Sequence, residues 1–158
     1  MRRKDREVTD IAEIDAIIAK ADVCRVALCN ENVPYIVVMN FGYIAGNPSV
    51  LYFHCANKGR KLDMLEQNSY VCFEMDIDHK LIGGQNACDC GMDYSSVIGY
   101  GNLYVVANEA ERNTGLNAIM QHYTGRNDYA FDTKIMRATT ILRLDVATMN
   151  AKQRITKD

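Results

Sequence analysis

Short apolar segments rich in β-branched and aromatic residues fill the first half of the chain, and only a few residues separate most of them. They lie at residues 24–30, 35–43, 50–54 and 70–75. Turn-forming Asn, Gly, Pro and Ser residues stand between the first three segments. A parallel strand pair needs a crossover of about a dozen residues or more, whereas antiparallel strands can be joined directly. The segments therefore predict an antiparallel sheet and disfavour a doubly wound parallel one.

Three helices are expected beside these strands. The first begins at Thr9 or Asp10, carries isoleucines at helical spacing and ends near Ala21. The second spans about 58–68, and the third runs from a capping-box-like start at Asn108 to Gly125. Further strands are expected at 95–106, 138–146 and about 148–155. We predict one domain over residues 1–158, mainly β with flanking helices (α+β), folded as an antiparallel Greek-key split β-barrel.

Charge and hydropathy restrict the partners. The formal net charge of −2 gives no electrostatic reason to expect nucleic acid or an anionic membrane surface. No apolar run approaches the length of a membrane span, and the charged start of the chain lacks the apolar region of a secretory signal. We therefore expect a cytoplasmic protein.

The six cysteines are expected to be reduced thiols in such a protein. Four of them, Cys24, Cys29, Cys55 and Cys72, lie in apolar segments and are predicted to be core residues. The remaining pair, at 88 and 90, lies in a glycine-containing polar loop, where two thiols could react with oxidants or help to bind a soft metal. Because a second cysteine pair of matching spacing is missing, we do not predict a metal site.

An anion site is predicted where the apolar segment ending at His54 runs into a basic turn and a helix. Lys58, Gly59, Arg60 and Lys61 stand at this junction. Free N–H groups of a first helical turn, the helix dipole and nearby cations together favour a phosphate. The alternative interpretation is a set of solvated surface cations.

Four segments together resemble the 5-nitroimidazole resistance (Nim) family within the pyridoxamine-phosphate-oxidase-like split β-barrels. They are the charged residues 1–7 before a helix, PYIVVMNFGY at 34–43, HCANKGRKLD at 54–63 and ACDCGMDYSSVIGYG at 87–101. The resemblance covers nearly the whole chain. It implies an FMN-binding type of split barrel, in which a homodimer holds FMN at the subunit interface.

Carried onto this sequence, the resemblance implies three groups of cofactor-binding residues. The phosphate is expected on Arg60 and Lys61 with backbone from Lys58 and Gly59. The flavin ring is expected along Val37, Val38, Met39 and Asn40, with His54 nearby. Hydroxyl groups of Tyr94, Ser95 and Ser96 are expected near the flavin of one or the other subunit, unless the two serines merely supply polarity at the start of a strand.

Family members often carry Thr-Gly-Lys near the end of the last strand, where this chain has Asn150-Ala151-Lys152, so a contact from Lys152 is in doubt.

His54 is the candidate catalytic residue. A neutral imidazole at this strand end could donate to a substrate or relay a proton. The alternative is a histidine that fills a pocket wall and hydrogen-bonds to backbone.

The resemblance implies an FMN-dependent oxidoreductase that reduces a small-molecule acceptor, with 5-nitroimidazoles reduced at the nitro group to an amine. Two rivals remain. A pyridoxamine-phosphate-oxidase-like oxidase is disfavoured because relatives with that activity usually end in an Arg-Leu-x-Pro-type tail, and no proline follows Pro48. The second rival is a non-catalytic flavin- or haem-binding protein.

Overall fold

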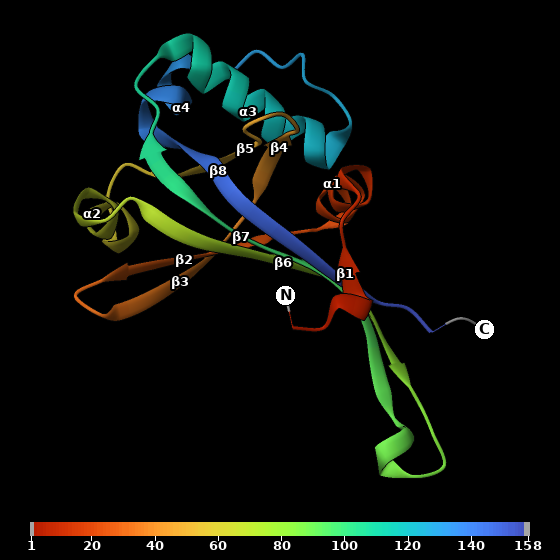
Figure 1. Ribbon diagram of the computed structural model, residues 1–158. Coiled ribbons are helices and arrows are strands. Elements are labelled where there is room, and N and C mark those ends of the chain that lie inside the picture. The colour runs from red at the N-terminus through yellow and green to blue at the C-terminus, as the bar shows by residue number, and fades with distance from the viewer. Residues whose placement is uncertain (1, 157–158) are drawn as a thin grey trace.

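An antiparallel sheet makes up most of the computed structural model, which describes residues 2–156 (Figure 1). The hydrogen-bonded order is β3-β2-β6-β7-β8-β5-β4, with β1 added to β8. Consecutive strands β3 and β4 lie at opposite ends of this order, so the sheet curls and the predicted antiparallel split β-barrel is confirmed. The strands are β1 (Glu7–Val8), β2 (Cys24–Asn30), β3 (Val33–Met39), β4 (Phe41–Ile44), β5 (Val50–Ala56), β6 (Tyr70–Ile82), β7 (Gly91–Val105) and β8 (Thr139–Arg154).

The extended segment predicted at 35–43 is interrupted at Asn40, where it changes partners. Met39 pairs with Cys24 of β2, whereas Phe41 pairs with Phe53 of β5. Met39 and Phe41 are both buried, so the alternation of inward and outward side chains continues across the break. This segment therefore carries the chain from one end of the sheet to the other.

The last third of the chain forms one strand and not the two that were predicted. Opposite β7, Thr148 pairs with Tyr100 and Val146 with Gly101, so Ala147 has no partner. Such an extra residue is a β-bulge, which bends a strand without ending it. The predicted bend is real, but β8 continues through it.

The helices are α1 (Ile11–Lys20), α2 (Arg60–Gln67), α3 (Glu109–Thr124) and α4 (Thr133–Ala138), with short 3-10 turns η1 (Lys4–Arg6) and η2 (Ala87–Asp89). The side chain of Asp10 caps α1, that of Asn108 caps α3, and Gly125 ends α3 in the left-handed conformation, as predicted. The short α4 was not predicted. No helix in the described part of the chain is long and apolar enough to cross a membrane.

Two apolar clusters hold the helices against the sheet. In the main core, Phe41, Phe53 and Phe73 pack with side chains of α1 and α2. The smaller core lies under α3, where a Cβ atom on Gly42 would stand 2.3 Å from the carbonyl carbon of Ala118. This glycine thus permits the close approach of α3 to β4.

The prediction that Cys29 is a core residue is wrong, because its side chain is exposed. It follows the buried Leu28 on β2 and therefore points to the outward face. Cys24 is buried, and Cys55 and Cys72 are half-buried.

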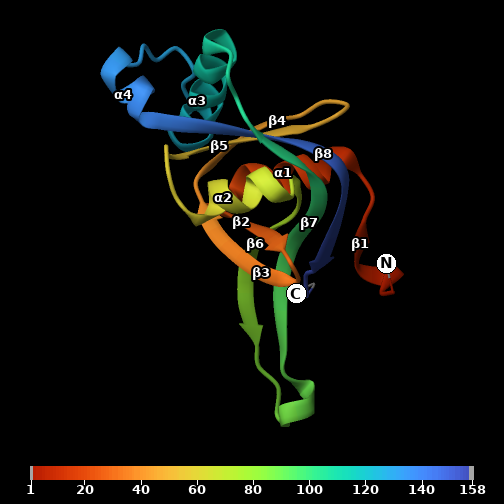
Figure 2. The same ribbon diagram turned by 90° about the vertical axis from the view of Figure 1, so that its left-hand side faces the viewer.

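Beyond the barrel, β6 and β7 continue together as a two-stranded hairpin that projects from the rest of the molecule (Figure 2). Its base follows a register shift between Ile77 and Lys80, and its tip contains η2. We call residues 80–92 the arm. The sequence predicted only a polar loop at the tip.

Candidate anion and cofactor site

The turn between β5 and α2 is fixed in place by Asn57. Its side-chain amide donates to the carbonyl oxygen of Arg137 at 2.8 Å, and its Oδ1 atom accepts from the hydroxyl of Thr140, also at 2.8 Å. These bonds tie the turn to α4 and β8. The start of α2 is thereby held in position, a role of Asn57 that sequence reasoning missed.

The first turn of α2 presents unused backbone donors. Gly59 precedes the helix with φ 142° and ψ 161°, so α2 begins at Arg60 and not at Lys58 as predicted. The first N–H groups that bond within the turn are those of Leu62 and Asp63, both to the carbonyl of Gly59. Within residues 2–156, the N–H groups of Arg60 and Lys61 have no acceptor. Together with the helix dipole, these donors fit an anion.

The basic side chains of this turn face solvent and strand β3. Lys58 and Arg60 are exposed, and Lys61 is half-buried. The guanidinium carbon of Arg60 lies 4.6 Å from the ring centroid of Tyr35, a cation–π contact between α2 and β3. In Figure 2, α2 accordingly lies between β5 and β3. Tyr35 was not among the predicted site residues, because its contact with Arg60 depends on the tertiary fold.

Strand β3 has one edge free. It pairs with β2 alone among the described strands, so N–H and C=O groups alternate along its other edge. On this strand Val37 is half-buried, Val38 is exposed and Met39 is buried, and the following Asn40 is exposed. A free strand edge beside a basic helix start suits a planar group with ring donors and acceptors and an attached phosphate.

His54 lies near the end of β5, opposite Ile141, with its side chain exposed. No hydrogen bond or ion pair within residues 2–156 engages its imidazole. Within the described residues its ring does not make the backbone hydrogen bond that the alternative interpretation expects. Its catalytic role stays a prediction.

Tyr94, Ser95 and Ser96 lie at the opposite end of the barrel. At one end of the β7–β8 ladder Val105 pairs with Leu142, beside the partner of His54. At the other end Tyr94 pairs with Arg154, and Ser96 follows two residues later opposite Lys152. Nine residues of strand separate Val105 from Ser96, which corresponds to about 30 Å. One copy of the chain therefore does not bring these hydroxyls to α2.

The surroundings of these hydroxyl residues differ. Ser95 is buried and accepts a hydrogen bond from the side-chain amide of Gln153 at 2.8 Å. The Nζ atom of Lys152 lies 5.5 Å from the ring centroid of Tyr94. Hydrogen bonding to Lys152, assisted by Arg6, lowers the pKa of Tyr94. The sequence left the role of Lys152 in doubt, and here it contacts Tyr94.

A hollow of about 780 Å³ lies along α2 and reaches the basic turn. Its size is within the range of small-molecule sites. Lys58 and Gly59 of the basic turn line it, together with the carboxylates of Asp63 and Glu66 and with Tyr104. Because carboxylates repel an anion, the free N–H groups and cations at the start of α2 are a better anion site than the acidic part of this hollow.

Comparisons with known proteins agree with the fold and with the resemblance found in the sequence. The sequence profile described as pyridoxamine 5'-phosphate oxidase matches residues 10–153. A crystal structure from Bacteroides thetaiotaomicron VPI-5482, provisionally described as a 5-nitroimidazole antibiotic resistance protein, shares 30% identity. The match covers 93% of this chain and 86% of that one, with a TM-score of 0.81. A search of curated proteins finds no match.

More distant structures share the fold. An FAD- and haem-binding protein from Mycobacterium smegmatis is 19% identical, with a TM-score of 0.83 over 97% of this chain and 76% of that one. A flavocytochrome from Azotobacter vinelandii is also 19% identical, with a TM-score of 0.80 over 99% of this chain and 72% of that one.

Proposed function

The chain belongs to the pyridoxamine 5'-phosphate oxidase family, and from this premise we propose that it binds FMN and reduces small acceptors. Among these acceptors we place 5-nitroimidazoles, whose nitro group would be reduced to an amine. The observation that carries the proposal is the basic, donor-rich start of α2 beside the free edge of β3. The likeness to the Bacteroides thetaiotaomicron protein supports the choice of acceptor.

The phosphate is assigned to α2. Arg60 and Lys61 supply two positive charges and two free N–H groups, and Lys58 adds a third charge at the rim. Gly59 has no side chain to obstruct the approach, and apart from its chain neighbours no residue has an atom within 4 Å of the place where its Cβ would be. These features match the recognition of a terminal phosphate ester by a helix start.

The ring is assigned to β3. The backbone of residues 37–39 offers alternating donors and acceptors on its free edge, and the exposed Asn40 adds an amide. When bound, FMN supplies the transfer of reducing equivalents, and the protein supplies binding, orientation and access. We assign to His54, which is exposed near the strand end before the basic turn, the role of holding a proton for the acceptor's oxygen atoms.

We further propose that the working form is a homodimer with FMN at the subunit interface. Within one copy, about 30 Å of β7 separates Ser96 from Val105, which lines a hollow with residues of α2. In the dimer, the end of β7 that carries Tyr94 in one subunit would lie beside α2 of the other subunit. Both subunits would then contribute residues to each cofactor site. The opposite ends of one β7 then serve two different cofactor sites.

The decisive experiment is an absorption spectrum of the purified protein, with identification of the chromophore released on denaturation. We expect an oxidised-flavin spectrum and released FMN. Reduced nicotinamide should bleach it, and a 5-nitroimidazole should restore it. A colourless protein that also fails to take up added FMN would overturn the proposal, whereas bound flavin that stays inert would leave a binding protein without reductase activity.

Variants test the assignment of the phosphate. The double variant Arg60→Ala/Lys61→Ala removes two charge-assisted contacts of about 1.5–3 kcal/mol each, so the Kd for FMN should rise about 10²- to 10⁴-fold. Arg126→Ala removes an exposed cation paired with Asp128 and serves as control. FMN fluorescence titration measures both. Equal affinities for the two variants would place the phosphate elsewhere.

His54 is tested by separating turnover from binding. His54→Ala should lower turnover while the Kd for FMN stays near that of the wild type, because the imidazole is assigned to the acceptor. His54→Asn keeps a hydrogen-bond donor that cannot titrate. Relative to His54→Ala, it should restore binding of the acceptor, but it should not restore the pH dependence of turnover. A loss of FMN affinity with unchanged turnover would make His54 a cofactor ligand.

A further inference from the structure

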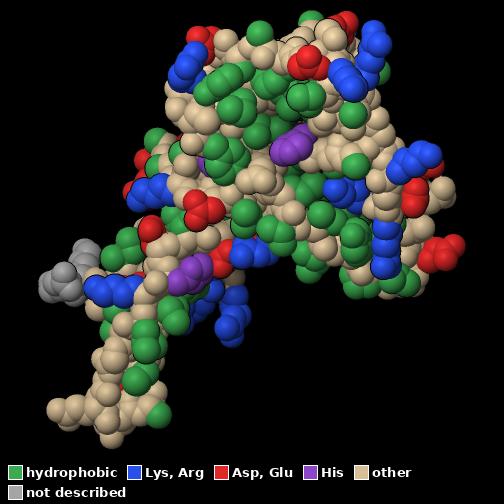
Figure 3. Space-filling view, turned by 180° about the vertical axis from the view of Figure 1, so that it is seen from behind, with side chains coloured by type: hydrophobic (Ala, Val, Ile, Leu, Met, Phe, Trp, Pro, Cys, Tyr) green, Lys and Arg blue, Asp and Glu red, His purple; other side chains and the backbone are tan. Residues whose placement is uncertain are grey.

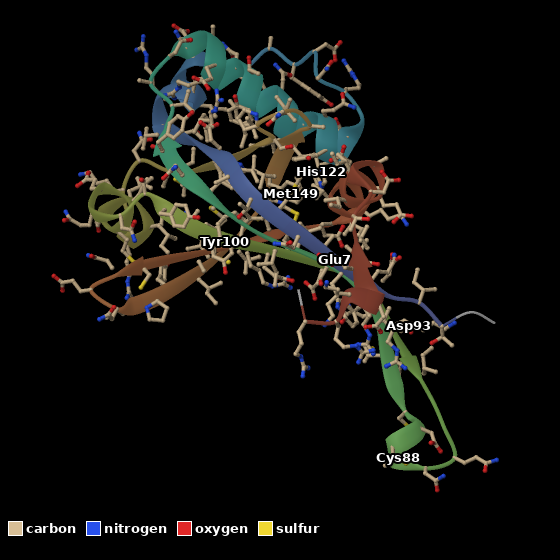
Figure 4. The ribbon with its side chains drawn as sticks, viewed as in Figure 1. Glu7, Cys88, Asp93, Tyr100, His122 and Met149 are labelled. Atoms are coloured by element: carbon tan, nitrogen blue, oxygen red, sulfur yellow. The ribbon has the colours of Figure 1, made fainter. Side chains whose placement is uncertain are left out.

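A cavity of about 450 Å³ lies at the end of the molecule that carries α3 and α4. Its lining comes from the start of α3, from α4 and from the segment that joins the two helices. In Figure 4 this end is at the top, opposite the arm tip that Cys88 marks. The volume is within the range of small-molecule sites. Among residues 2–156, none of those that we assign to FMN lines this cavity, so it is separate from the cofactor site.

Arg112 on α3 lines this cavity, and its positive charge is not neutralised. Its Nη2 atom donates to the carbonyl oxygen of Met136 and, at 2.8 Å, to that of Thr139, both at the end of α4. These acceptors are neutral, and within residues 2–156 the Nε and Nη1 atoms of Arg112 have no acceptor. The side chain is half-buried, yet it forms no ion pair in this part of the chain. A partly desolvated cation without a counter-ion favours the binding of an anion.

Arg137 on α4 adds a second guanidinium group to the lining. Its side chain is exposed, and it too forms no ion pair among the described residues. Figure 3 shows Lys and Arg side chains at this end of the molecule, which is drawn at the top. Glu109 contributes the one carboxylate of the described lining. Two guanidinium groups against one carboxylate leave a single excess positive charge, which a monoanion would balance.

Phe131 and Met136 give the cavity an apolar contact surface. Phe131 precedes α4 and Met136 lies on it, and both side chains are half-buried. An aromatic ring and a thioether pack well against a flat apolar group. The hydroxyl of Thr133 also lines the cavity and can donate a hydrogen bond to an oxygen atom. The lining thus combines positive charge with apolar surface, which is the combination that an organic acid requires.

We propose that this cavity binds a small organic monocarboxylate with a flat apolar body, such as an aromatic acid. Arg112 and Arg137 hold the carboxylate, and the apolar body lies against Phe131 and Met136. A phosphate ester carries a higher charge and is better matched by the start of α2, where three cations stand beside two free N–H groups. The inference goes beyond the proposed function and does not depend on it.

The test is isothermal titration calorimetry of the purified protein with benzoate. We expect saturable binding to one site per chain. Benzamide has nearly the same shape but no charge, so its Kd should be about tenfold higher or more. Arg112→Gln keeps an amide donor for the carbonyl groups at the end of α4 but removes the charge, so it should raise the Kd for benzoate about 10- to 100-fold. Absence of saturable benzoate binding, or equal affinity for benzamide, would overturn the proposal.

A second pair of variants does not disturb the contact between α3 and α4. Arg137→Glu reverses one charge of the lining at an exposed side chain, and the Kd for benzoate should rise about tenfold or more. The control Lys134→Glu makes the same charge change at an exposed residue of α4 outside the lining, so it should bind like the wild type. Circular dichroism establishes that each variant is folded. Equal affinities of Arg137→Glu and Lys134→Glu would contradict the assigned position of the carboxylate.

The location is tested against the start of α2. Arg60→Ala/Lys61→Ala should bind benzoate as the wild type does, because neither residue lines the cavity. The photoreactive acid 4-benzoylbenzoate should label peptides that contain residues 107–113 or 131–137. Labelling of α2 instead, or loss of benzoate binding in the α2 variant, would place the carboxylate at the anion site and overturn the proposal. These measurements do not use turnover, so a failure of the reductase assignment leaves their outcome unchanged.

Discussion

Strands β6 and β7 run through two different environments, the barrel and the arm. In the barrel their inward side chains, such as Phe73, Met75 and Val97, are fully buried. In the arm the same two strands remain paired at Leu81–Met92, yet 71% of Leu81 and 43% of Met92 are exposed. Backbone pairing and a well-capped turn are thus enough to define the arm's shape, whereas burial stabilises the barrel. A change in one region should consequently have little effect on the stability of the other.

The largest effect is expected in the barrel core. Phe53 is fully buried and pairs with Phe41 and Leu142 on its two neighbouring strands. Phe53→Ala should lower the free energy of unfolding by about 3–5 kcal/mol, because it loses apolar burial and leaves a cavity. Met92→Ala in the arm should change it by less than about 0.5 kcal/mol. Urea denaturation measures both, and similar losses would contradict the division into two regions.

A smaller effect is expected where α3 meets the outer side of the barrel. Arg143 on β8 bonds to Glu111 of α3 at 2.6 Å and to Asp145 at 2.7 Å. Arg143→Ala leaves both carboxylates without this partner and should cost about 1–3 kcal/mol. The exposed pair of Arg126 and Asp128 provides the control, since Arg126→Ala should cost about 0–1 kcal/mol. If thermal denaturation gives equal losses of stability for Arg143→Ala and Arg126→Ala, the half-buried cluster contributes no more than an exposed ion pair.

The joint between barrel and arm should respond to acid. The buried carboxylate of Asp93 accepts hydrogen bonds from the backbone and the hydroxyl of Thr156, which lowers its pKa below the ordinary value of 3.8. Its contribution to stability is therefore complete above about pH 4. It is lost as the pH falls through the lowered pKa, because the unfolded chain takes up the proton first. Asp93→Asn should flatten the acid limb of the stability profile, and an unchanged limb would contradict this origin.

The smallest global effect is expected at the arm tip. Asn86→Ala removes one half of the capping box that Asn86 and Asp89 form around η2, which is worth about 1 kcal/mol locally. Hydrogen exchange of the tip amides should accelerate about fivefold to tenfold, while the urea midpoint stays the same, since the arm opens without the barrel. A shifted midpoint would mean that the arm and the barrel unfold together.

Elements with local signals could be predicted from the sequence. Asp10, Asn108 and Gly125 marked helix ends by their own chemistry, and short links between β-branched segments indicated an antiparallel barrel. The basic turn at 58–61 was also local, because the residues that make it are consecutive.

Features that depend on pairing could not be predicted. Asn40 gives no sign that the strand changes partners there, and Ala147 gives none that β8 continues through a bulge. The sequence of the arm predicts a loop, because its tip is rich in glycine and polar residues and only a short ladder joins its strands. The contact of Arg60 with Tyr35, and the distance of Tyr94 from α2, are likewise set by the way the sheet curls.

Strand β8 pairs with β1, β5 and β7, and so joins both halves of the sheet, although it is the last strand in chain order. During synthesis, the segment formed by β2, β3, β6 and β7 and the hairpin of β4 and β5 therefore leave the ribosome before the strand that unites them. Their apolar inner faces stay open until residues 139–154 have emerged. Such late, long-range closure slows folding and exposes the nascent chain to aggregation and to chaperones. The rate at which the last strand docks, more than the formation of any helix, should set the yield of native protein in the cell.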